Sequence, residues 1–134
     1  MKRIKLFESF VKLDPNEVLE DIKVISYELE DNDCLSSYMF RIYTNGILSY
    51  VTPEEYNHEL NYAIKPGDIK CDMIIILIEP IGRISDKYYS DLDRFTSLLR
   101  EHLDYIDPKK ITNNINSVST HLLQRRQRVT VDLL

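Results

Sequence analysis

The sequence predicts an α+β fold, a two-layer sandwich in which two principal helices cover one face of a mainly antiparallel sheet of three to five strands. Three observations predict this fold. Two segments repeat apolar residues at helical spacing, an Asn-Gly pair joins two β-rich segments, and the isoleucine-rich run at 74–78 is apolar enough for a strand buried on both faces. A chain of 134 residues can build such a core without a disulfide or a metal.

The first expected helix begins after Asp14, which is a good N-cap. Pro15 suits the first helical position, and Glu17 stands where it completes a capping box. We expect the helix to end near Asn32, with that residue as its left-handed terminator. Its buried stripe consists of Val18, Ile22, Ile25 and Leu29, which recur at 3.6-residue spacing.

A β-hairpin is expected next. Asn45-Gly46 is typical of a type I′ turn, which requires positive φ at both central residues. The flanking segments, residues 37–44 and 47–51, are rich in β-branched and aromatic side chains. They predict two tightly joined strands.

The segment after the hairpin allows two interpretations. Thr52 as cap, Pro53 at the first position and Glu55 at the third predict a short helix to about Tyr62. The alternative is a strand over 58–64 that turns at "KPGD" into the next strand.

The strand "IKCDMIIILIEP" should be central in the sheet, because its isoleucine core leaves neither face for solvent. Ser85 then caps the longest expected helix, about 86–106. The stripe of this helix consists of Tyr88, Leu92, Phe95, Leu99 and Leu103.

The last quarter of the chain is harder to interpret. Asp107-Pro108 ends the long helix and can start another, because apolar residues keep helical spacing from Ile111 to Leu122. The stretch "TNNINSVST" consists of poor helix formers, which weakens that interpretation. The final "RVTVDLL" alternates apolar and polar residues and predicts a strand.

The charge distribution divides the chain. The net charge is −5, yet residues 14–107 hold 20 acidic and 8 basic side chains, and both ends are basic. We expect a basic amphipathic N-terminal segment at 1–13, followed by a single α+β domain at 14–134. An acidic body can hold its basic ends against itself or present them to a partner.

No residues are predicted to be catalytic, to bind a cofactor or to bind a metal. The three glycines are isolated, so no phosphate-binding loop is present. Cys34 and Cys71 have no metal or redox spacing and are expected to be reduced thiols. Glu55 and His58 lie one helical turn apart, but a di-iron site needs that motif twice, so we expect a capping role for the glutamate.

One basic cluster is a candidate for partner binding. Arginine and glutamine suit phosphate and base-edge contacts, but nucleic-acid binding is not favoured because the body of the chain is acidic. We expect a protein partner instead, or salt bridges within the chain. The cluster consists of Lys109, Lys110, Arg125, Arg126 and Arg128.

The opening "MKRIKLFESF" resembles the N-termini of small uncharacterised proteins of large tailed, T-even-like bacteriophages, which have the form M-K-x-x-K-L-F-E-x-F. It is also similar to capsid-targeting propeptides that a prohead protease cuts after Leu-x-Glu. The resemblance implies a processing site at Leu6, Phe7 and Glu8, with cleavage before Ser9.

The function predicted from these features is that of a small non-catalytic phage accessory protein. It would act through protein–protein interaction in the bacterial host cytoplasm or, if packaged, in the phage head. One alternative is a virion structural subunit of neck or tail-completion type, a homo-oligomer that forms a ring. Another is an enzyme of unrecognised type, which would need a deep pocket with converging side chains. No apolar run approaches the ~18 residues of a membrane span.

Overall fold

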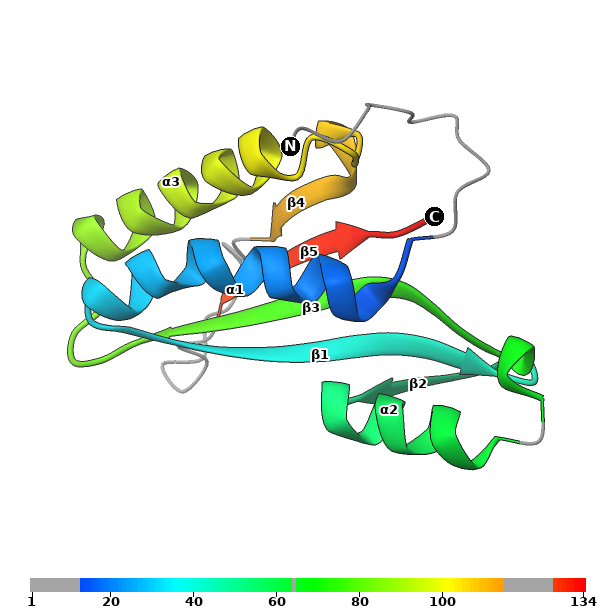
Figure 1. The fold of residues 1–134 in the computed structure, drawn as a ribbon. Coiled ribbons are helices and arrows are strands. Elements are labelled where there is room, and N and C mark those ends of the chain that lie inside the picture. The colour runs from blue at the N-terminus through cyan, green and yellow to red at the C-terminus, as the bar shows by residue number, and fades with distance from the viewer. Residues whose placement is uncertain (1–12, 64, 115–126) are drawn as a thin grey trace.

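The computed structural model describes residues 13–63, 65–114 and 127–134, which form three helices and a five-stranded sheet (Figure 1). The strand order is β2-β1-β3-β5-β4, and all neighbouring strands are antiparallel. Helices α1 and α3 lie across one face of the sheet, and α2 lies at the hairpin end (Figure 1). The predicted fold class is confirmed. The elements are α1 (Pro15–Asp31), β1 (Cys34–Thr44), β2 (Ile47–Val51), α2 (Pro53–Tyr62), β3 (Ile69–Pro80), α3 (Asp86–His102), β4 (Ile111–Asn114) and β5 (Gln127–Asp132), with short 3₁₀ helices at Pro66–Asp68 and Pro108–Lys110.

Helix α1 begins after Asp14 and ends before Asn32, as predicted, but Glu17 forms no capping box and the left-handed residue that follows the helix is a different one. The Asp14 carboxylate caps it by accepting from the backbone N–H of Asn16 at 3.0 Å. Asn32 was expected to be the left-handed terminator, but its φ is −104° and the left-handed residue is Asp33, at φ 60°. The physical reason is that the Asn32 side-chain amide donates to the Glu28 carbonyl at 2.9 Å, which satisfies the helix end one residue earlier.

The hairpin is confirmed. Asn45 and Gly46 have φ of 51° and 81°, as a type I′ turn requires, and Thr44 lies opposite Ile47. Strand β1 starts at Cys34 instead of residue 37, because it pairs with β3 over its whole length and not only with β2.

Replacing Gly46 with alanine is expected to lower the free energy of unfolding by about 1 kcal/mol, because an L-residue is strained at φ 81°. The measurement is urea denaturation followed by circular dichroism. Gly67→Ala is the matched control. A side chain at residue 67 meets nothing within 4 Å, and its φ is not positive, so the change should be within about 0.5 kcal/mol. Equal losses in both variants would contradict the assigned turn.

The segment after β2 is a helix, so the alternative of a strand over 58–64 is wrong for residues 58–62; residue 64 lies outside the described residues. The predicted capping box is complete. Thr52 Oγ1 accepts from the Glu55 N–H at 3.1 Å, and the Glu55 carboxylate accepts from the Thr52 N–H at 3.2 Å.

Helix α3 is shorter than predicted, and among residues 103–114 only the short 3₁₀ helix Pro108–Lys110 follows it, not a second α-helix. It ends at His102 instead of residue 106. At that end, the N–H of the C-cap residue Leu103 donates to the Leu99 carbonyl. Leu103 and Ile106 are buried nevertheless, so the helical spacing reflected burial and not helix length. Residues 111–114 form β4, since pairing with β5 outweighs their weak helical preference. Residues 115–126 lie outside the described residues.

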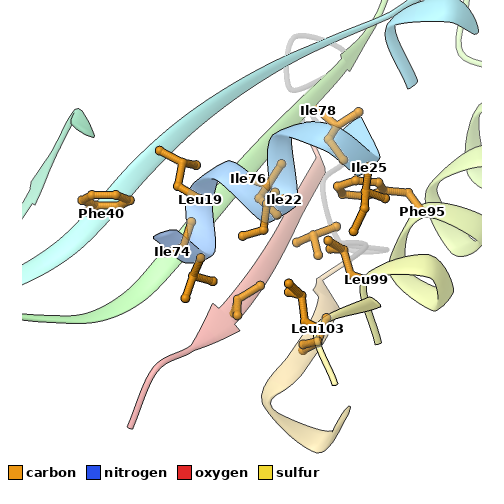
Figure 2. Close-up of a cluster of buried hydrophobic side chains, with 14 of the residues drawn as sticks. Leu19, Ile22, Ile25, Phe40, Ile74, Ile76, Ile78, Phe95, Leu99 and Leu103 are labelled. Atoms are coloured by element: carbon orange, nitrogen blue, oxygen red, sulfur yellow. The ribbon is translucent and has the colours of Figure 1, made fainter. Parts of the chain in front are cut away.

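The core lies between the sheet and helices α1 and α3 (Figure 2). Strand β3 is the central strand, as predicted. Ile74, Ile76 and Ile78 point towards the helices and are fully buried, whereas Ile75, on the opposite face, is 5% exposed. The predicted helix stripes also face this core. Their fully buried members include Ile22, Leu92 and Leu99.

Candidate functional site

The described residues hold no cluster of side chains suited to a metal ion. No group of three or more His, Cys, Asp or Glu side chains in residues 13–63, 65–114 and 127–134 could hold a metal ion. Glu55 caps its own helix, and the His58 ring stacks against Tyr62 with ring centroids 4.6 Å apart. These two side chains therefore have local structural roles.

The two thiols are poor nucleophiles. Burial raises the pKa of the Cys34 thiol, with a further rise from Asp91, and burial raises the pKa of Cys71 to about 12. The thiolate is the reactive form of cysteine, so the raised pKa values lower the reactivity of both groups at neutral pH.

Native protein treated with a thiol reagent at pH 8 is therefore expected to react slowly at both cysteines. At Cys71 the rate should be at least about a hundredfold below that of the unfolded chain, because its pKa stands near 12 instead of 9.0. Peptide masses after timed quenching measure the rate at each thiol. Rapid modification of Cys71 in the folded chain would make it a candidate nucleophile.

The same burial should make the free energy of unfolding fall at alkaline pH. Burial raises the pKa of Tyr56, like that of Cys71, to about 12. The folded state keeps both groups neutral, whereas the unfolded state ionises them from pH 9 to 10 upwards. We expect the midpoint of urea denaturation to be constant between pH 7 and 8.5 and to fall as the pH rises towards 12. A midpoint that is unchanged up to pH 11 would contradict this.

An ion pair lies where β1 and β3 change register. Arg41 donates from Nε and Nη2 to the two carboxylate oxygens of Asp72, at 2.9 and 2.7 Å. The register shifts between Arg41 and Ile42, so Asp72 is the extra residue on β3. The hydrogen bond to Asp72 raises the pKa of Arg41 above its ordinary value. The Arg41 guanidinium and the Asp72 carboxylate form a bidentate ion pair with each other, which favours a structural role for both side chains.

An open groove of about 920 Å³ lies between the hairpin, α2 and the 3₁₀ helix Pro66–Asp68. Its apolar side includes Ile47 and Tyr62, and its polar side includes His58, Glu59 and Lys65. The charged side chains that line it are of mixed sign and come from different elements.

Exposed apolar side chains lie on both faces of β2 at the hairpin: Ile47 and Tyr62 line the groove, whereas Leu48 and Tyr50 are on the opposite face of the strand. Ile47 is 71% exposed, Leu48 44%, Tyr50 51% and Tyr62 77%. We call these four residues the hairpin patch. It lies at the hairpin end of the sheet, where α2 is beside β2 (Figure 1). Exposed apolar residues that cluster in this way are typical of a protein-binding surface.

Sequence reasoning missed the hairpin patch, although a signal existed. Strand β2 reads "ILSYV", which contains no charged residue and has large apolar side chains at both alternating positions. A half-exposed strand usually alternates apolar with polar residues.

The structure does not bring together the described members of the predicted basic cluster. Lys109 and Lys110 precede Ile111, which pairs with Val131, whereas Arg128 lies at the other end of β5. Arg125 and Arg126 lie outside the described residues, as do the processing-site residues Leu6, Phe7, Glu8 and Ser9. Both sites stay predictions.

The comparisons with known proteins add no assignment: the chain matches no family model, no curated protein and no solved structure. Among the described residues, no helix combines the length and the apolar character needed to cross a membrane.

Proposed function

We propose that the protein is a small non-catalytic accessory protein that acts through protein–protein contact at the hairpin patch. The observation that carries the proposal is this group of exposed apolar residues on β2 and α2. A hydrophobic patch with polar groups at its border matches the composition of protein interfaces, where tyrosine is enriched and charge is depleted.

A protein partner fits this surface better than a nucleic acid does. Phosphate contacts need several free lysines or arginines on one face. Near the hairpin patch Arg41 is already paired with Asp72, and Lys65 shares the groove with Glu59 and Asp68. The net charge of −5 also opposes binding to a polyanion.

We assign the accessory role to a tailed bacteriophage because of the N-terminal resemblance at residues 1–10. The protein would act in the bacterial host cytoplasm or inside the phage head. A virion structural subunit is the second candidate. The outer edge of β2, which pairs with no described strand, favours it, because sheet edges can join copies of a chain.

A photo-crosslinking amino acid at Leu48 tests the contact role. The matched control carries the same amino acid at Ser97, which is exposed on α3 and lies outside the hairpin patch. Irradiation of the native source is expected to give a defined protein adduct from residue 48 and none of the same mass from residue 97. Identical adducts from both positions, or none from residue 48, would contradict the proposal.

The intact mass of the chain recovered from virions tests the packaging role. A mature chain that starts at Ser9 would support cleavage and packaging. A full-length chain found only in infected cells would leave the cytoplasmic role.

A further inference from the structure

We propose that the partner of the hairpin patch is a second copy of this chain, joined by antiparallel pairing of β2 with β2 about a two-fold axis at Ser49. This inference rests on the proposed function, since it names the partner of that same surface. Four features of β2 carry it: its outer backbone groups, which pair with no described strand, its lack of protection, its self-complementary side chains and its neutrality.

Among the described residues, the backbone groups on the outer edge of β2 have no strand partner. Thr44 and Ile47 close a two-residue turn and form a hydrogen-bonded pair, and such pairs alternate along an antiparallel ladder. The N–H and C=O groups of Ser49 therefore point to β1, whereas those of Leu48 and Tyr50 point away from it. No described strand lies on that side of β2.

The two edges of the sheet differ in protection. At β4, Arg100 of α3 donates from Nε and Nη2 to the Ile111 carbonyl at 3.2 and 2.8 Å, so α3 shields that edge. β4 is also short and rich in asparagine. Proteins usually blunt an exposed edge with charge, proline or a bulge, and β2 has none of these devices. An edge left open in this way is suited to strand addition.

The β2 sequence complements itself in the antiparallel direction. With Ser49 opposite Ser49 of the second copy, Leu48 lies opposite Tyr50 and Ile47 opposite Val51. Leu48 and Tyr50 are the residues whose backbone groups point away from β1. Each of the two Leu48–Tyr50 pairs between the copies can therefore form two hydrogen bonds. Each opposed pair is apolar or a serine pair, and no like charges meet across the axis. The side chains of β2 are therefore compatible with pairing to a second copy of the same strand.

Sedimentation equilibrium of the full chain gives the first test. The mass is expected to rise with concentration from 15.9 kDa towards twice that value. Ser49→Lys and Ser49→Glu each place like charges directly across the axis and should weaken dimerisation about fivefold, whereas an equimolar mixture of the two variants should restore it. A monomer at every concentration would overturn the inference.

Cysteine crosslinking tests the register. Residues at a non-hydrogen-bonded antiparallel position have Cα atoms about 4.5 Å apart, which suits a disulfide. Ser49→Cys should therefore form a disulfide-linked dimer under mild oxidation. Thr112→Cys, exposed on the β4 edge, is the control and should not. A mixture of Leu48→Cys and Tyr50→Cys chains should crosslink faster than either chain alone. A dimer that lacks these crosslinks would overturn pairing through β2.

The outcomes separate this inference from the proposed function. A photo-adduct of residue 48 with a different protein, from a chain that stays monomeric, would overturn the homodimer and keep the contact role. The absence of any adduct, together with a monomer, would overturn both.

Discussion

Replacing Ile76 with alanine is expected to lower the free energy of unfolding by about 3 kcal/mol, within the ~2–5 kcal/mol range for buried isoleucine. Ile76 is fully buried at the centre of β3, between Tyr38 of β1 and Val129 of β5. The helices on one face and the paired strands on either side restrict collapse of the resulting cavity (Figure 2). Urea denaturation followed by circular dichroism measures the change.

The control for this prediction is Val24→Ala. Val24 lies on α1 but is 70% exposed, so truncation removes little buried area, and alanine is the better helix former. Its stability should change by no more than about 0.5 kcal/mol. If Ile76→Ala cost as little as Val24→Ala, the isoleucine run would not form the core, and the fold described above would be wrong.

The elements that the sequence predicted correctly are those with a local cause. Asn45-Gly46 sets its own turn, and the Thr52–Glu55 capping box satisfies donors within one helical turn. The isoleucine run of β3 can only be buried, wherever the rest of the chain lies. In each case the physical reason is contained in a few consecutive residues.

The errors in the type and length of the elements from α3 onwards occurred where distant residues decide. Ile111 has helical spacing with its successors, but pairing with Val131 makes it a strand residue. Leu103 and Ile106 continue the helical stripe of α3 although the helix has ended, because the core buries them all the same. Helical spacing cannot distinguish a helix from a buried turn that follows one.

The candidate site was missed for a related reason. Leu48 and Tyr50 look like ordinary strand residues until the strand order shows that β2 is an edge. Whether a strand is central or at an edge is a property of the whole sheet, which the sequence of one strand does not contain. The basic cluster, in contrast, was predicted from sequence proximity, and the sheet separates Lys110 from Arg128.

The ion pair of Arg41 and Asp72 gives the second large effect, and the two halves of the pair should differ. The side chain of Asp72 is 10% exposed and that of Arg41 is 27% exposed. Arg41→Met leaves a buried carboxylate without its bidentate partner and should cost about 3 kcal/mol. Asp72→Asn leaves an arginine that can reach water and should cost only about 1–2 kcal/mol. Urea denaturation of both variants measures the difference.

The double variant Arg41→Met/Asp72→Leu decides whether the pair acts as a unit. With both charges removed, no buried charge is left unpaired, so its cost should be smaller than the sum of the single costs by at least about 1 kcal/mol. Additive costs would show that the two side chains act separately. The pair also joins β1 to β3 at their register shift, and β1 pairs with β2 on its other side. Arg41→Met should therefore also reduce the disulfide yield of Ser49→Cys, because the edge that pairs with the second copy is held in place by the strand beside it.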